Sequence, residues 1–280
     1  MSRAAVMSDF FNDAEQFLRE IGIFNVPSRI FNVDETWYCE KAEKMRKVVV
    51  PSTSKMPYKV HGGRKDHTTM TMCASAEGTV LPTMFTFKGS IPRDSSVHEL
   101  RPKDALYTES ESGHIDSELY IQYIKHIEPF LGRTRPVVIF QDNAGCHENL
   151  ELIEFCIDKN VHLYNLPSKT THLLQPLDKI FGLLKDKIED VKHETHIVQQ
   201  KSVKKSQIPM VVRFAINRIS TKQCKTRFRR QVSVPWMYRQ SMSLYLWEIV
   251  YLRAAKTTGK TVYQTLKTFS FRCLMKREMT

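Results

Sequence analysis

The sequence lacks a long apolar run, a paired-cysteine motif and a recognisable leader segment. The longest apolar stretch near its end, Leu244–Leu252, contains Glu248 and is too short to span a bilayer, so we expect no membrane association. The six cysteines include no CxxC pair, which argues against a zinc site or a disulfide framework and favours a reducing compartment. No apolar segment follows Arg3, so the N-terminus does not resemble a signal peptide.

Acidic residues are scarce in the last third of the chain. The formal net charge of the 280 residues is +12, and residues 191–280 hold 19 of the 42 Lys and Arg residues but only three of the 30 Asp and Glu residues. A basic segment beside a near-neutral one indicates a polyanionic partner, most often nucleic acid. A solvated basic tail explains the same charge, and charge alone does not separate the two interpretations.

Hydrophobic periodicity predicts an α/β chain. The expected elements are a helix around 10–18, a strand over 29–38, strands over 67–76 and 81–89 joined at Glu77-Gly78, a helix over 117–131 capped by Asp116, a strand over 136–142, a helix over 149–160, a strand over 161–167 and a helix over 177–191. Residues 41–65 and 90–115 have the composition of loops. A hairpin followed by alternating helices and strands favours a mixed sheet flanked by helices.

Three aspartates occupy the ends of these predicted elements. Asp34 and Asp142 follow strands, and Asp178 opens the last helix, in the stretch LPSKTTHLLQPLDKIFG. Sites in α/β proteins gather at the carboxyl ends of strands, and carboxylates without His or Cys suit Mg²⁺ or Mn²⁺. Taken singly, each aspartate has a simpler explanation: Asp34 could begin a turn, Asp142 could cap the next helix, and Asp178 could favour the helix dipole.

The sequence around these aspartates resembles a known family. The blocks NVDETWY, VVVPSTSKMPYKVHGGRKDHTTMTMCASAEGTVLPTMFTFKG, GHIDSELYIQYI, PVVIFQDNAGCH and NVHLYNLPSKTTHLLQPLDKIFGLLK occur in the order found in DDE-type transposases of the pogo, Tigger and Jerky group, which includes the domesticated centromere protein B. The resemblance covers roughly residues 10–191. QPLD preceded by PSKTTHLL is highly specific, and 35 residues separate Asp142 from Asp178, a spacing characteristic of one branch of the family.

The resemblance implies an RNase H-like fold with a mixed five-stranded sheet. It divides the chain into an N-terminal stub (1–9), a DDE-type endonuclease domain (10–192) and a basic, mainly helical extension (193–280). It also implies a DNA endonuclease and transposase in which Asp34, Asp142 and Asp178 bind two Mg²⁺ or Mn²⁺ ions. One ion would activate water or a DNA 3′-hydroxyl, and the other would stabilise the leaving oxygen.

The same resemblance sets the expected partners. DNA is the expected partner, no small-molecule substrate is expected, and a homo-oligomer or a second protein would supply sequence-specific recognition. A DNA partner in turn implies the nucleus, and the short basic runs KSVKK and KTRFRR accord with it.

Residues beside the three aspartates have auxiliary roles in this interpretation. His147 matches a family histidine that contacts DNA or metal-bound water, although a local hydrogen bond at a helix start explains it equally simply. Asn143 neighbours Asp142, and Gln175 belongs to the loop that delivers Asp178. Glu35 points to the opposite face of its strand and is expected in a supporting role. Cys146 is not expected to be a nucleophile, because no base or oxyanion loop is recognisable.

The basic extension offers a candidate phosphate-binding surface. Its residues are Arg227, Arg229, Arg230, Lys256 and Lys260. Gly259-Lys260-Thr261 lacks the first glycine of a phosphate loop, so no nucleotide site is expected. A tail unrelated to the family is the alternative interpretation of the residues from Gln240 onward.

Two departures from the family pattern support an alternative function. About 30 residues precede NVDET, where family members usually carry helix-turn-helix domains, and QPLDKIFG is one residue shorter than usual between Asp178 and Phe181. One deleted residue turns the following helix by about 100°. The alternative is therefore a relic or domesticated protein that binds DNA or chromatin without cutting it. A nuclease acting on RNA–DNA hybrids is a third hypothesis, since the implied fold permits it.

Overall fold

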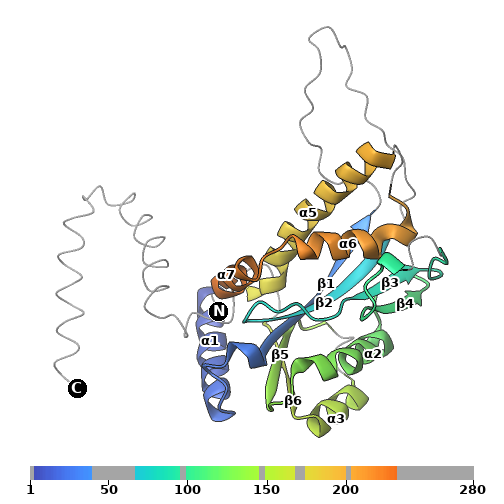
Figure 1. The fold of residues 1–280 in the computed structure, drawn as a ribbon. Helices are drawn as coiled ribbons and strands as arrows, with labels where there is room; N and C mark the ends of the chain where they lie inside the picture. The colour runs from blue at the N-terminus through green and yellow to red at the C-terminus, as the bar shows by residue number, and fades with distance from the viewer. Residues whose placement is uncertain are drawn as a thin grey trace, which may run out of the picture. The chain divides into compact units, whose positions relative to one another are not determined.

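The computed structural model of the protein describes residues 3–39, 67–94, 99–144, 149–167, 174–199 and 203–231. These residues lie in one compact unit, Met1–Ser233, which is built around a single sheet (Figure 1). None of the helices in these ranges is long and apolar enough to cross a membrane.

The sheet has six strands in the order β4-β3-β2-β1-β5-β6. The strands are β1 (Ile30–Cys39), β2 (His67–Ser75), β3 (Met84–Lys88), β4 (Leu106–Ser110), β5 (Val137–Gln141) and β6 (Val161–Asn165). β2 runs antiparallel to β1 and β3, whereas β1, β5 and β6 run parallel to one another. The predicted RNase H-like class, a mixed α/β sheet flanked by helices, is confirmed.

Helices cover both faces of the sheet (Figure 1). They are α1 (Arg3–Glu20), α2 (Ser117–Ile127), α3 (Leu150–Asp158), α5 (Pro176–Gln199), α6 (Ile208–Asn217) and α7 (Thr221–Gln231). α2 begins at the predicted cap, because the carboxylate of Asp116 accepts a hydrogen bond from Leu119 N at 2.9 Å. On one face, α2 and α3 pack against Phe31, Val33 and Ile139.

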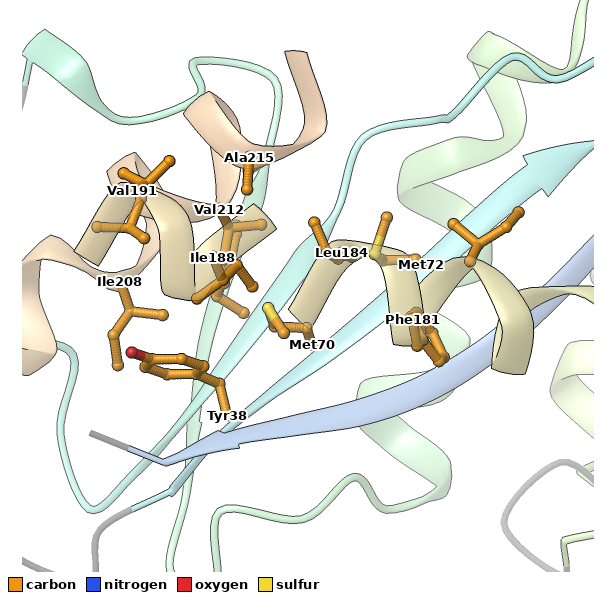
Figure 2. Packing of buried hydrophobic residues seen from close by; sticks show 14 of the residues in the cluster. Tyr38, Met70, Met72, Phe181, Leu184, Ile188, Val191, Ile208, Val212 and Ala215 are labelled. Carbon is orange, nitrogen blue, oxygen red and sulfur yellow. The ribbon is translucent and has the colours of Figure 1, made fainter. Parts of the chain in front are cut away.

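The opposite face carries the larger core, and α5 crosses it. Figure 2 shows Tyr38, Met70 and Met72 of β1 and β2 meeting the apolar stripe of α5, with α6 closing over them. The stripe consists of Ile180, Phe181, Leu184, Ile188 and Val191, all of them buried. Spacings of three and four residues place these side chains on one side of the helix, so the burial fixes the rotation of α5 about its axis.

The structure corrects the strand count from five to six. Residues 106–110 were expected within a loop, but they form β4, which pairs in parallel with β3. LYTES carries no alternating apolar pattern, because an edge strand buries little of its surface. Its pairing instead includes a contact between the buried hydroxyl groups of Thr86 and Thr108, whose Oγ1 atoms lie 2.9 Å apart.

Within the described part of the predicted extension, α6 and α7 follow α5. The proposed boundary between residues 192 and 193 falls inside α5, which continues to Gln199. Both α6 and α7 contact α5, so the part of the extension that the structure describes packs with the sheet. Residues beyond 231 lie outside the described ranges.

Candidate metal-binding site

Asp34 and Asp142 project from neighbouring parallel strands. β1 and β5 pair from Ile30↔Val138 to Asn32↔Phe140, and the pairing ends there. Asp34 and Asp142 each follow the last paired residue of their strand by two positions, so the register places them at the same level and on the same face. Both are partly buried.

The position of Asp34 differs from the prediction in one respect. Asp34 was expected at the end of its strand, but β1 continues to Cys39 because β2 pairs along its whole length, including Asp34↔Met72. Asp34 lies just beyond the carboxyl end of the parallel pairing between β1 and β5, not at the end of β1 itself. The start of α5 contacts β1 at this point.

Asp178 is the third residue of α5 and lies in its first turn. The helix start is held against β1, because Leu177 N donates a hydrogen bond to the side-chain Oδ1 of Asn32 at 3.1 Å. Asn32 is fully buried, and its Nδ2 also donates to Phe140 O of β5 at 2.9 Å. One amide therefore joins the three elements that carry Asp34, Asp142 and Asp178.

The electrostatics of Asp34 show that the three carboxylates act on one another. The pKa of Asp34 is raised well above its ordinary value, first by burial and then by the negative charges of Asp178, Glu35 and Asp142. A hydrogen bond from Glu35 N to Asp34 Oδ1, at 2.7 Å, opposes this rise without cancelling it. Burial and the neighbouring carboxylates therefore disfavour the ionised form of Asp34, and a nearby positive charge would favour it.

This donor set fits a hard divalent cation in its chemistry. Carboxylate oxygens are the ligands that Mg²⁺ and Mn²⁺ prefer, and a cation would relieve the mutual repulsion at Asp34. Within the described ranges, however, no three Asp, Glu, His or Cys side chains are close enough to form a complete chelating group. The chemistry of the three aspartates therefore fits Mg²⁺ or Mn²⁺, but their described arrangement is not by itself a closed metal site.

A second polar network joins the two residues on either side of Asp142, Gln141 and Asn143, to neighbouring elements. Gln141 is buried, and its Oε1 accepts from Tyr120 OH at 2.7 Å while its Nε2 donates to Asn165 Oδ1 at 2.8 Å. Asn165 Nδ2 in turn donates to the side chain of Asn143 at 3.3 Å. These bonds connect α2, β5 and β6 with the residues on either side of Asp142. The predicted auxiliary residue Asn143 is therefore part of the support of the loop after β5.

Gln175 supports the start of α5. It is fully buried, and its Nε2 lies 3.4 Å from Val33 O, beside Asp34. Its Oε1 is buried without a hydrogen-bond partner among the described residues. The shortened spacing after Asp178 leaves Phe181 buried against the sheet.

The structure also tests the simpler explanations of the aspartates. Asn149 caps α3, with its Oδ1 accepting from Glu151 N at 2.8 Å, so Asp142 is not that cap. Asp142 Oδ1 instead accepts from Ala144 N at 3.3 Å. Asp34 begins no turn, because it lies within β1. Asp178 does lie in the first turn of a helix, where the dipole favours it.

Of the other residues predicted from the sequence, the structure describes the side chains of Glu35 and Arg227. Glu35 lies towards α2, where burial raises the pKa of Tyr120 and Tyr123 and the charge of Glu35 adds a smaller rise. Arg227 lies on α7, and its Nη1 donates to Lys179 O of α5 at 2.9 Å. Arg229 and Arg230 also belong to α7, but their side chains lie outside the described part of the structure, as do Cys146, His147, Lys256 and Lys260.

Sequence reasoning missed Asn32, Gln141 and Tyr120. Asn32 lies two residues before Asp34 in NVD and Gln141 lies directly before Asp142 in QD, and a polar residue inside an otherwise apolar strand is the signal that marks them. Their partners come from other elements, so no local pattern identifies the bonds.

Comparison with known proteins gives one family match. Residues 65–232 match the family described as DDE superfamily endonuclease. The match covers more than half of the chain and includes Asp142 and Asp178, whereas Asp34 precedes it.

Individual relatives are distant. The chain is 25% identical over 126 residues to a Cochliobolus lunatus protein named MFS-type transporter clz9, across 44% of this chain and 14% of that protein. It resembles a pre-cleavage Mos1 transpososome with 15% identity and a TM-score of 0.45, over 81% of this chain and 64% of that one. A Mos1 mariner paired end complex with Mn gives 14% identity and a TM-score of 0.46, over 82% and 62% of the two chains. The chain spans less than two thirds of the length of each of these proteins.

Proposed function

The chain belongs to the DDE superfamily of endonucleases, and from this we propose that it cleaves and joins DNA by phosphoryl transfer at Asp34, Asp142 and Asp178. The observation that carries the proposal is the convergence of three elements at one end of the parallel pairing. Asn32 lies two residues before Asp34 on β1. Its side chain bonds Phe140 O, two residues before Asp142, and Leu177 N, one residue before Asp178.

The carboxylates would hold Mg²⁺ or Mn²⁺, two ions in the arrangement expected for this family. Bound divalent cations supply charge stabilisation to the attacking and leaving oxygens of a transferring phosphate. The structures with Mn and with Mg among the similar proteins support the choice of metal. Bound cations would offset the neighbouring negative charges that, after burial, raise the pKa of Asp34.

DNA is the partner that supports this chemistry best. The net charge of +12 favours a polyanion, and the similar structures include a pre-cleavage transpososome and a strand transfer complex. Their paired-end assemblies support an oligomer of this chain on DNA. Nuclear localisation belongs to the same proposal, because a DNA-cleaving protein of this kind must reach chromatin.

One observation favours a second candidate, DNA binding without cleavage. The three carboxylates do not form a complete chelating group within the described part of the chain. A relic transposase that still folds and still carries its basic surface would bind DNA in a salt-dependent way and leave it intact.

Plasmid nicking separates the two candidates. Purified protein is incubated with supercoiled plasmid and Mn²⁺ or Mg²⁺, beside Asp142→Asn, Asp178→Asn and the control Asp104→Asn, which alters an exposed loop carboxylate. We expect metal-dependent nicking by the wild type and the control, and a loss of at least about 100-fold in the two site variants. Plasmid retention without nicking, weakening steeply as salt rises, would instead support the relic.

A further inference from the structure

We propose that Asn32 is the positioning residue of this site: its side-chain amide holds together the three elements that carry the carboxylates proposed to bind metal. The inference rests on the proposed function and deepens it, because it assigns the geometry of the metal site to a residue that itself binds no metal.

The first step is the location of Asn32. It is the last residue of β1 that pairs with β5, opposite Phe140, and it is fully buried. Asp34 lies two residues further on the same face of the strand. Nothing about apolar packing calls for an asparagine here, since a buried amide is costly unless its hydrogen bonds are made.

The second step is the pairing of donors and acceptors. Phe140 O needs a donor, and Asn32 Nδ2 supplies it at 2.9 Å. Leu177 N needs an acceptor, and Asn32 Oδ1 supplies it at 3.1 Å. An amide of this length offers both groups at once, whereas aspartate offers only acceptors and leucine offers neither.

The third step concerns α5. Leu177 is the second residue of the helix, so its N–H is one of the first four amides that have no acceptor within the helix. Asn32 therefore caps α5 from a strand 145 residues away in the sequence. Because Asp178 directly follows Leu177, the cap holds the backbone of Asp178 beside β1, which carries Asp34.

The consequence is a geometric one. Without the amide, β5 and the start of α5 remain attached to β1 through other contacts, but their carboxylate-bearing ends are free to shift. Displacements of about 1 Å in such sites cost on the order of 100-fold in rate. Mg²⁺ demands near-ideal octahedral geometry and should respond to such a shift more strongly than Mn²⁺.

The experiment measures metal binding in the absence of DNA. Mn²⁺ and Mg²⁺ are titrated separately, by calorimetry, into the wild type, Asn32→Leu, Asn32→Asp and the control Thr86→Val. Thr86 is also fully buried and hydrogen-bonded, to Thr108, but it lies on β3, at the other side of the sheet. Circular dichroism establishes the folded fraction of each variant beforehand.

We expect both Asn32 variants to lose at least tenfold in Mn²⁺ affinity per folded molecule and more in Mg²⁺ affinity. Thr86→Val should lose thermal stability and keep both affinities. Asn32→Asp retains the acceptor for Leu177 N and provides a folded variant if Asn32→Leu does not fold.

The outcomes distinguish the two levels of the proposal. Wild-type affinities in folded Asn32 variants, with plasmid nicking by the wild type, would overturn the role of Asn32 and leave the proposed function intact. A wild type that binds neither ion would overturn the proposed function and the inference with it. A loss of affinity equal to that of Thr86→Val would reduce Asn32 to a purely structural residue.

Discussion

The guanidinium of Arg227 donates a hydrogen bond to the backbone carbonyl of Lys179, with 2.9 Å between Nη1 and O. Lys179 directly follows Asp178, so this bond ties α7 to the first turn of α5. Arg227 was expected to contact DNA phosphates. Its described contact is internal, and it adds α7 to the elements that hold the helix carrying Asp178.

Replacement of Arg227 should therefore affect the site as well as the fold. We expect Arg227→Ala to lower the free energy of unfolding by about 1 kcal/mol, and the Tm by roughly 2–4 °C, because an exposed charge-assisted hydrogen bond is lost. The matched control is Arg213→Ala, since Arg213 Nη1 donates to Leu100 O at 3.2 Å away from the aspartates. Mn²⁺ affinity should fall in Arg227→Ala but not in Arg213→Ala. Equal Mn²⁺ affinities in the two variants would show that the bond from Arg227 to Lys179 does not help to position Asp178.

Asp34→Asn should stabilise the metal-free protein at neutral pH. A raised pKa means that the folded state binds the Asp34 proton more tightly than the unfolded state does. This contribution to stability is fully present below the ordinary value of 3.8 and is lost as the pH rises through the folded-state pKa. Asparagine imitates the neutral form, so we expect the Tm to rise by roughly 2–4 °C at pH 7 in the presence of a chelator.

Two further measurements define the effect of Asp34→Asn. The Tm difference from the wild type should shrink as the pH is lowered towards 4, where Asp34 itself becomes neutral. Millimolar Mn²⁺ should raise the Tm of the wild type but not that of the variant, because only the wild type gains binding free energy. A variant that is less stable than the wild type in chelator at pH 7 would show that Asp34 is not under repulsion.

The shortened segment after Asp178 gives a test by insertion. Adding one alanine between Lys179 and Ile180 restores the spacing usual in the family, but turns the following helix by about 100° relative to Asp178. Because burial of Phe181, Leu184 and Ile188 fixes the rotation of α5 (Figure 2), the insertion should instead displace Asp178 and break the bond between Leu177 N and Asn32. We expect a chain that still folds by circular dichroism but binds Mn²⁺ more weakly in calorimetry, and wild-type Mn²⁺ affinity would contradict this.

Gly78 lies where the turn between β2 and β3 meets α7. Its φ is +92°, and a Cβ atom there would lie 2.7 Å from Thr221 O. Gly89 also has a positive φ, +80°, but a Cβ there would meet nothing within 4 Å. Gly89→Ala should therefore cost about 1 kcal/mol through backbone strain alone, and Gly78→Ala roughly 1 kcal/mol more through the added clash. If both variants lose the same free energy of unfolding in urea, α7 must move away from the added Cβ atom without a loss of stability.

Local patterns predicted most of the elements. The wholly apolar VVIF of β5, the cap at Asp116 and the stripe of α5 each identify their element because the burial is repeated at a fixed period. β4 was missed because an edge strand needs only one neighbour, and that neighbour, β3, supplies the hydrogen bonds whatever the apolar pattern.

The sequence identified the three carboxylates of the candidate site, whose role stays a prediction, but not the residues that support them. Asp34, Asp142 and Asp178 were identified from the family resemblance and the strand ends, both of which are visible along the chain. The roles of Asn32 and Gln141 depend on partners in other elements, since Asn32 bonds residues 108 and 145 positions away. A single buried amide in a strand signals that a partner exists but does not identify it.

The central place of β1 in the sheet has a consequence for the newborn chain. β1 can pair with β2 early, but Asn32 meets its last partner, Leu177, only after 145 further residues have been added. At about 5–20 residues per second, ribosomal synthesis takes roughly 7–30 s to reach that point. Until then Asp178 cannot join Asp34 and Asp142, so the proposed site is incomplete in a growing polypeptide. The proposed cleavage would require synthesis through the start of α5.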